Sequence, residues 1–266
     1  MVEREPSLIA RVALGALGIG LFVAAWFAVA ASVDPLRLPP PTDVAEVVFP
    51  ILFESRPLAN QLGSGDGGIL PHLLASLGRL LAGSAIGVAA GLAVGLLMSY
   101  SRRIGWLLDL PTRLLRAVPP LGVIPFVLVW FGTSSTAQIL LVALFVFLLV
   151  VVNTTNAVQN LRPVYARFAR TMGASRLRTY RDVVLPGILP SLVGGLRAAL
   201  AFAWGLLVVA ELVGGRYGIG RVLSLLVPLL RTPELIACIL WIVVVAVALD
   251  ALLLAVQARL LRWHHA

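Results

Sequence analysis

The sequence of 266 residues contains no lysine, because all 21 of its basic residues are arginine. A phosphate-binding loop of the Gly-x4-Gly-Lys-Ser/Thr type needs a lysine, so this chain carries no such nucleotide site. The single cysteine, Cys238, lies in an apolar run and has no second cysteine with which to form an internal disulfide. The histidines lack metal-ligand spacing, and no Ser-His-Asp set, catalytic pair of carboxylates or Cys/His cluster is visible. We therefore expect no catalytic residues, no metal and no cofactor.

Charge is also scarce. Only 12% of the residues are charged, 60% are hydrophobic, and the mean hydropathy is +0.99. Soluble domains are nearer 45–50% apolar and about 25% charged, so the composition predicts an integral membrane protein. The net charge of +9 does not indicate nucleic-acid binding, because the arginines gather between the apolar runs, where the positive-inside rule explains them.

Six apolar runs approach the length of about 20 residues that a membrane span needs, which predicts an all-α polytopic protein with about six transmembrane helices. The runs are 12–32, 76–99, 116–132, 136–153, 191–213 and 235–256. The third contains Pro119, Pro120 and Pro125, which would break an ordinary helix, so the pattern also allows five or seven spans.

The arginines predict the orientation. With the N-terminus inside, the segments assigned to the cytoplasm hold fourteen arginines and the external segments hold five, with Arg79 and Arg197 near span ends and uncounted. This bias favours both termini in the cytoplasm.

The first 70 residues are predicted to be an anchor helix followed by an external linker. Residues 28–31, Ala-Val-Ala-Ala, imitate a signal-peptide cleavage site, but the preceding apolar stretch is longer than signal peptides usually have, which favours an uncleaved anchor. We expect a short helix over 44–53 after a Thr42 cap and a flexible Gly/Ser tract at 63–68. Residues 71–81 repeat leucine with helical spacing, which predicts a helix along the membrane interface before the span.

The strongest polar feature is residues 161–190, which contain six arginines between two apolar runs. One apolar stripe with helical spacing runs through them, formed by Leu161, Val164, Tyr165, Phe168 and Met172. Gly173 stands where a helix C-cap would lie, and Ser175 can cap a second short helix that Pro186 and Pro190 end. The pattern predicts a helix, a tight turn and a helix on the cytoplasmic face. An ordinary basic loop against anionic headgroups is the alternative, but such a loop has no need of an apolar stripe.

The sequence ARTMGASRLRTYRDVVLPGILPSL within this segment resembles the cytoplasmic signature loop of type I ABC-importer permeases. That signature is roughly Glu-Ala-Ala, three residues, Gly, about nine residues, an apolar residue, one more residue, and Leu-Pro. Gly173 matches the glycine, and Val183, Leu185 and Pro186 match its end. Residues 116–132, 196–215 and 36–44 are similar to the nitrate/sulfonate/taurine group, so the resemblance covers most of 71–257.

The resemblance implies a permease domain over 71–257, with a coupling loop at 161–186 and a cytoplasmic tail at 258–266. Its implied partners are two copies of a cytoplasmic ATP-binding subunit, an external solute-binding protein, a second permease copy and membrane lipid. ATP hydrolysis would then occur on a separate chain. The implied solute is a small anion such as a sulfonate, taurine or nitrate, although related permeases handle vitamin precursors such as pyrimidines.

By this resemblance, the residues expected to couple the permease to the ATPase lie around the matched glycine: Arg167, Phe168, Ala169, Arg170, Met172, Gly173 and Ala174. The chain departs from the signature there, because Arg167-Phe168-Ala169 stands where the family has Glu-Ala-Ala. We therefore expect the partner surface opposite Arg167 to be acidic or neutral.

Candidates for the translocation pathway are Pro119, Pro120, Pro125 and Glu211. Prolines inside a membrane free backbone carbonyls, which is tolerated where the backbone is buried or lines a cavity. Glu211 and Asp250 are the two clear carboxylates within spans, where charge is costly and commonly functional. A proton-coupled secondary transporter that uses these two carboxylates is the main alternative. An intramembrane enzyme and a passive scaffold subunit are two others.

Overall fold

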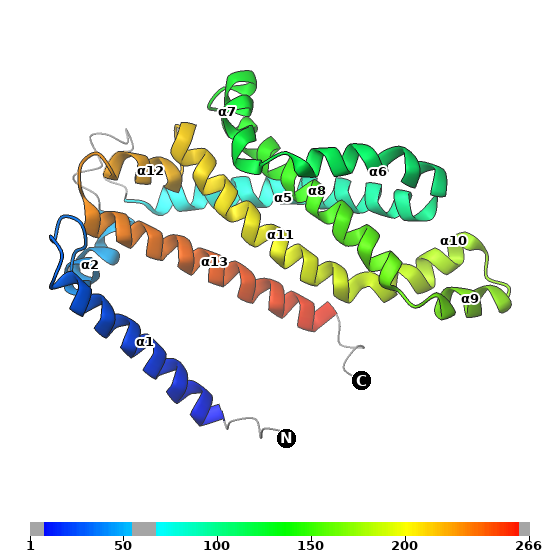
Figure 1. The fold of residues 1–266 in the computed structure, drawn as a ribbon, viewed down its shortest axis with the longest axis horizontal. Coiled ribbons are helices and arrows are strands. Elements are labelled where there is room, and N and C mark those ends of the chain that lie inside the picture. Colours follow the sequence, from blue (N-terminus) through cyan, green and yellow to red (C-terminus); the bar gives the residue numbers. More distant parts are fainter. Residues whose placement is uncertain (1–7, 55–67, 261–266) are drawn as a thin grey trace. The chain divides into compact units, whose positions relative to one another are not determined.

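The computed structural model describes residues 8–54 and 68–260. These residues form helices and no strands, which confirms the all-α prediction (Figure 1). Five helical segments are long and apolar enough to cross a membrane: Ile9–Ala30, Leu70–Tyr100, Ser135–Asn160, Arg176–Gly214 and Thr232–Arg259. A bent pair, Arg102–Ala117 with Pro120–Phe131, brings the number of candidate spans to six if it is counted as one. The predicted number of about six is thus confirmed.

The third predicted span, 116–132, is wrong as a single helix. Helix α6 (Arg102–Ala117) ends before Val118, and α7 (Pro120–Phe131) begins after Pro119, with a bend of 93° between them. A proline disfavours helical backbone in the residue before it and lacks the N–H that a helix interior needs. Pro120 instead occupies the first turn of α7, where the missing N–H costs nothing. Pro125 lies inside α7 and does not end it.

The chain divides into two compact units. The first holds residues 1–70 and 223–241 and includes α1 (Leu8–Ala30), α2 (Pro41–Val48) and α3 (Pro50–Phe53). The predicted helix over 44–53 is wrong in two respects: it is broken at Phe49, and its N-cap is Pro40 rather than Thr42. Pro50 explains the break, because it has no N–H to continue the helical hydrogen-bond pattern, although the backbone of Phe49 itself stays helical. Of the predicted flexible tract 63–68, only Gly68 lies within the described residues.

Two indole N–H groups donate hydrogen bonds between separate segments of the first unit. Trp26 donates a hydrogen bond from Nε1 to the carbonyl of Pro39 at 3.0 Å, and Trp241 donates one to the carbonyl of Val48 at 2.7 Å. The ring of Phe49 also packs edge-on against that of Trp241. These bonds tie α1 and the start of α13 (Thr232–Leu260) to the polar segment around α2.

The second unit holds residues 71–222 and 242–266. Its long helices are α5 (Leu70–Tyr100), α8 (Ser135–Asn160) and α11 (Leu185–Gly214), with most of α13. The predicted interfacial helix over 71–81 is wrong as a separate element, because it continues without a break into the 31 residues of α5. Leu73 and Leu80 are buried, whereas Leu74 and Leu81 are exposed, so the leucine repeat does not form one buried face.

Four glycines spaced four residues apart allow α5 to pack closely against α8: Gly83, Gly87, Gly91 and Gly95. A Cβ on Gly83 would lie 2.7 Å from the carbonyl oxygen of Ile139, and one on Gly87 would lie 2.6 Å from that of Ala143. Small residues at this spacing let membrane helices approach until their backbones nearly touch.

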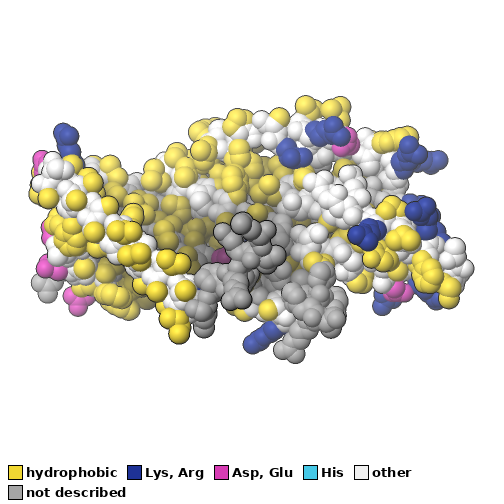
Figure 2. Space-filling view, turned by 60° about the horizontal axis from the view of Figure 1, so that its bottom comes forward, with side chains coloured by type: hydrophobic (Ala, Val, Ile, Leu, Met, Phe, Trp, Pro, Cys, Tyr) yellow, Lys and Arg dark blue, Asp and Glu magenta, His cyan; other side chains and the backbone are white. Residues whose placement is uncertain are grey.

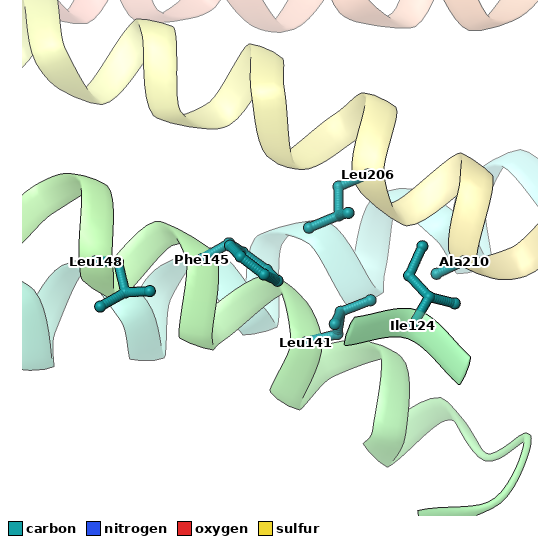
Figure 3. Close-up of a cluster of buried hydrophobic side chains, with 6 residues drawn as sticks. All are labelled: Ile124, Leu141, Phe145, Leu148, Leu206 and Ala210. Atoms are coloured by element: carbon teal, nitrogen blue, oxygen red, sulfur yellow. The ribbon is translucent and has the colours of Figure 1, made fainter. Parts of the chain in front are cut away.

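Larger side chains fill the space between α7, α8 and α11. They form a buried apolar cluster of Ile124, Leu141, Phe145, Leu148, Leu206 and Ala210 (Figure 3). The cluster fixes the short helix α7 to two long helices, so the proline-rich segment packs against the core of this unit.

Candidate functional site

The basic segment 161–190 forms the predicted helix, turn and helix. Helix α9 (Pro163–Thr171) ends at Met172, and Gly173 adopts the left-handed conformation with φ of 80°. The N–H of Ala174 then reaches back to the carbonyl of Ala169 at 3.0 Å. Helix α10 (Arg176–Thr179) begins after Ser175, whose hydroxyl oxygen accepts a hydrogen bond from the N–H of Arg178 at 3.3 Å. The glycine turn and the serine cap are confirmed.

The predicted end of this second helix at Pro186 and Pro190 is wrong. A five-residue π-helix, Tyr180–Val184, joins α10 directly to α11. Pro186 falls in the first turn of α11, where its missing N–H is tolerated, and Pro190 lies inside that helix. As a result, Arg176–Gly214 is one continuous helical segment of 39 residues.

The apolar stripe of α9 is uncovered. Phe168 is 67% exposed and Met172 is 74% exposed, and Val164, Tyr165 and Leu177 also face outward. Figure 2 shows arginine side chains gathered at the right-hand end of the view, where α6, α9 and α10 lie in Figure 1. Arg167 and Arg170 are exposed as well, whereas Ala169 and Ala174 are half-buried. An exposed patch that mixes large apolar side chains with arginines is typical of a protein-binding surface.

The pathway candidates separate into two groups. Pro119 and Pro125 are exposed and Pro120 is half-buried, all at or beyond the 93° bend. Glu211 is completely buried, in the last turn of α11. Hence the structure does not bring Glu211 and the three prolines together at one exposed surface.

Glu211 is held by a network of donors. Arg79 donates from Nη1 to Oε1 at 2.7 Å, Ser76 donates from its hydroxyl to Oε2 at 2.7 Å, and the N–H of Gly220 reaches Oε2 at 3.1 Å. Arg79 also donates from Nη1 to the carbonyl of Tyr217 at 2.6 Å. A buried carboxylate is tolerated where such partners satisfy it.

Two further groups complete this cluster. His72 accepts a hydrogen bond at Nδ1 from the N–H of Gly218, and its ring packs against that of Tyr217 with centroids 4.0 Å apart. Gly218 has φ of 128°, and a Cβ there would lie 2.3 Å from Cδ of Glu211. The chain therefore turns tightly over the carboxylate between α11 and α12 (Ile219–Leu226).

Asp250 is paired too. Arg197 donates from Nε and Nη2 to its two carboxylate oxygens, each at 2.8 Å. Both carboxylates that a proton-coupled mechanism would use are therefore bound to arginines, and this geometry gives no support to proton coupling. No pattern in the sequence singles out Ser76 or His72. Arg79 and Arg197 do carry a signal, because an arginine within an apolar run is the natural partner for a carboxylate within another apolar run.

Comparison with known proteins agrees with this architecture. Residues 83–263 match the family model described as "Binding-protein-dependent transport system inner membrane component". The taurine transport system permease protein TauC of Escherichia coli is 36% identical over 94% of this chain and 89% of its own length. A putative aliphatic sulfonates transport permease protein SsuC of Bacillus subtilis is 32% identical over 75% of this chain and 72% of its own length.

The nitrate import permease protein NrtB of Leptolyngbya laminosa is 32% identical over 74% of this chain and 71% of its own. Among solved structures, the inward-facing MetNI methionine ABC transporter aligns with a TM-score of 0.59 at 21% identity, covering 78% of this chain and 98% of that one, a likeness of fold. The chain therefore belongs to the family of binding-protein-dependent transport system inner membrane components, the multi-pass permease subunits of ABC importers.

Proposed function

We propose that this chain forms half of the translocation pathway for a small sulfonate and that a cytoplasmic ATPase docks on α9 and α10. The docking surface consists of Arg167, Phe168, Arg170, Met172 and Leu177, with Gly173 setting the angle between its two helices. The observation that carries the proposal is the exposed apolar stripe of α9 beside its arginines. In this assembly a second copy of the chain completes the pathway, and a solute-binding protein delivers the sulfonate from outside.

The proposed mechanism needs no chemistry in this chain. Two ATPase subunits close on ATP and move the docking surfaces, so the energy difference between inward-open and outward-open states is set outside the permease. Because α10 continues through the π-helix into α11, a displacement of α10 is carried directly into a membrane span. The arginine distribution supports both termini on the ATPase side.

The sulfonate assignment rests on the named relatives. The taurine and sulfonate permeases match this chain over most of its length, and the nitrate permease matches at similar identity. All three named solutes are small and carry an anionic group, so we place this chain's solute in that chemical class, with a sulfonate as the first choice.

Docking is tested by affinity purification of the tagged, full-length chain from its native membrane in mild detergent. We expect a soluble ATPase to co-purify with the wild type and with Phe168→Leu, which keeps the apolar contact, and to be lost with Phe168→Glu. Recovery of the ATPase with Phe168→Glu at wild-type yield would contradict the proposed surface. The solute is tested separately, by ATP-dependent uptake of labelled taurine into proteoliposomes containing the whole transporter, with nitrate as competitor.

A further inference from the structure

A polar cavity lies in the second unit and is lined by other residues than those of the proposed docking surface. The C-terminal end of α5, helix α6, the C-terminal part of α8 and Arg176 of α10 line a cavity of about 790 Å³ that is open on one side. Phe168 and Met172 do not line it. It is therefore a separate feature, although α10 contributes to both.

The cavity is strongly basic. Its lining contains four arginines, Arg102, Arg113, Arg116 and Arg176, and one carboxylate, Asp109. With these side chains in their usual charge states the lining has a net charge of +3. A concave surface lined by charges of one sign raises the local concentration of ions of the other sign.

Aromatic rings support two of these arginines. The guanidinium of Arg102 lies over the ring of Trp106, with Cζ 4.8 Å from the centroid, and that of Arg176 lies 4.5 Å over the ring of Tyr100. Stacking on a ring orients a guanidinium but leaves its charge uncompensated and most of its N–H edge free. Neither arginine is paired with a carboxylate among the described residues. Nη2 of Arg176 donates to the backbone carbonyl of Tyr100, and the other N–H groups of both guanidiniums remain to bind an anion.

Only one of the lining arginines is engaged with the lining carboxylate. Arg113 donates from Nε to Oδ1 of Asp109 at 3.0 Å, and both side chains are at least half exposed. On α8, Asn156 and Gln159 stand three residues apart, on the same helical face, and add side-chain amides to the lining. The cavity thus offers charged and neutral N–H donors from three helices.

We infer that this cavity binds a small oxyanion: a sulfonate, sulfate or phosphate group. Arginine is the side chain best suited to such groups, because its planar N–H fork matches two oxygens of one anion. A bound oxyanion would accept hydrogen bonds from α6, α8 and α10 and would thereby link three helices that line the basic cavity. A dissolved anion and the headgroup of an anionic phospholipid share this chemistry, so either can be the source.

The test measures binding of [³⁵S]sulfate to the full-length chain in nanodiscs of phosphatidylcholine at low ionic strength. We expect saturable binding that weakens about tenfold when Arg102 and Arg116 are both changed to glutamine, since charged hydrogen bonds are lost. Arg181→Gln removes one arginine charge from an exposed position outside the cavity and should leave the dissociation constant unchanged. Asp109→Asn should tighten binding, a gain that misfolding cannot produce.

Two competition arms distinguish the sources. Displacement of sulfate by a few mole per cent of phosphatidylglycerol in the nanodisc would identify a headgroup site, and displacement by dissolved taurine or phosphate alone would identify a site for free anions. The inference is overturned if wild type binds neither sulfate nor phosphatidylglycerol saturably, or if Arg181→Gln weakens binding as much as the cavity variants. Since the assay needs neither ATPase nor transport, its result is independent of the proposed function.

Discussion

Arg79 of α5 and Glu211 of α11 form a buried ion pair, 132 residues apart in sequence, with Nη1 and Oε1 separated by 2.7 Å. The carboxylate is fully enclosed, and the arginine also donates to the hydroxyl of Ser135 and to the carbonyl of Tyr217. A single pair thus joins α5, the start of α8 and the turn after α11.

Removing one member of this pair should destabilise the protein strongly. Arg79→Ala leaves Glu211 buried without its cation, which costs on the order of 3–5 kcal/mol. We expect a lower thermal unfolding temperature in detergent, measured by intrinsic fluorescence. The matched control is Arg113→Ala, which breaks the exposed pair with Asp109 and should change stability by less than about 1 kcal/mol. Equal effects of the two variants would show that the buried pair has no special role.

Gly218 should not tolerate alanine. Its φ of 128° is strained for any L side chain, and the added Cβ would lie 2.3 Å from Cδ of Glu211. Gly218→Ala should therefore reduce the yield of folded protein or its unfolding temperature. Gly205→Ala, in α11, adds the same methyl group where no heavy atom lies within 4 Å, and it should be tolerated. The ratio of monodisperse to aggregated protein by size-exclusion chromatography measures both variants.

The glycine series of α5 provides a second pair of matched variants. Gly87→Ala would place Cβ 2.6 Å from the carbonyl oxygen of Ala143, so α5 and α8 must separate, at a cost of about 1–3 kcal/mol. Gly78→Ala lies on the same helix with nothing within 4 Å. Thermal unfolding should distinguish them, and a stabilising effect of Gly87→Ala would contradict the close packing.

The turn between α9 and α10 should matter for coupling more than for folding. Gly173 has φ of 80° and open space around it, so Gly173→Ala is opposed by backbone strain of about 1 kcal/mol and by no clash. We expect a folded permease whose co-purified ATPase is less strongly stimulated by solute and binding protein. ATPase activity in proteoliposomes provides the measurement, and unchanged stimulation would show that the turn angle is unimportant.

We align Arg167 with the acidic residue of the signature loop through Gly173, and its side chain is exposed, where a partner can contact it. If the partner surface is acidic or neutral there, Arg167→Glu should weaken co-purification of the ATPase, and Arg167→Gln should have a smaller effect. Unchanged assembly and ATPase activity in Arg167→Glu would show that charge at this position does not matter.

The features that follow from local sequence were predictable. Apolar runs other than 116–132 predicted the spans correctly. Gly173 and the hydroxyl of Ser175 predicted the turn and the cap of the basic segment, because each depends on a few neighbouring residues. The ends of helices near proline were predicted less well. Pro120 separates two helices, whereas Pro186, Pro190 and Pro125 do not, since a first-turn position or surrounding packing can accommodate the ring.

The long-range contacts were not predictable from one sequence. Glu211 was visible as an intramembrane carboxylate, but its pairing with Arg79, Ser76 and Gly220 depends on how α5 and α11 meet. The basic cavity likewise depends on the approach of α6 to α8. No local periodicity identifies which residue of one helix meets which residue of another.

The right-angled elbow at Val118–Pro119 has a consequence for counting. Helix α7 has 12 residues and is only about 18 Å long, too short to cross a hydrocarbon core of about 30 Å alone. The elbow therefore decides whether the chain crosses the membrane an even or an odd number of times. With an even number, α13 ends on the side of the membrane where α1 begins, and with an odd number it ends on the opposite side. If α6 and α7 together make one crossing, the number of crossings is even, and the segment 161–181 lies on the same side as the start of α1 and the end of α13. Pro119 and Pro120 therefore determine on which side of the membrane the last helix ends.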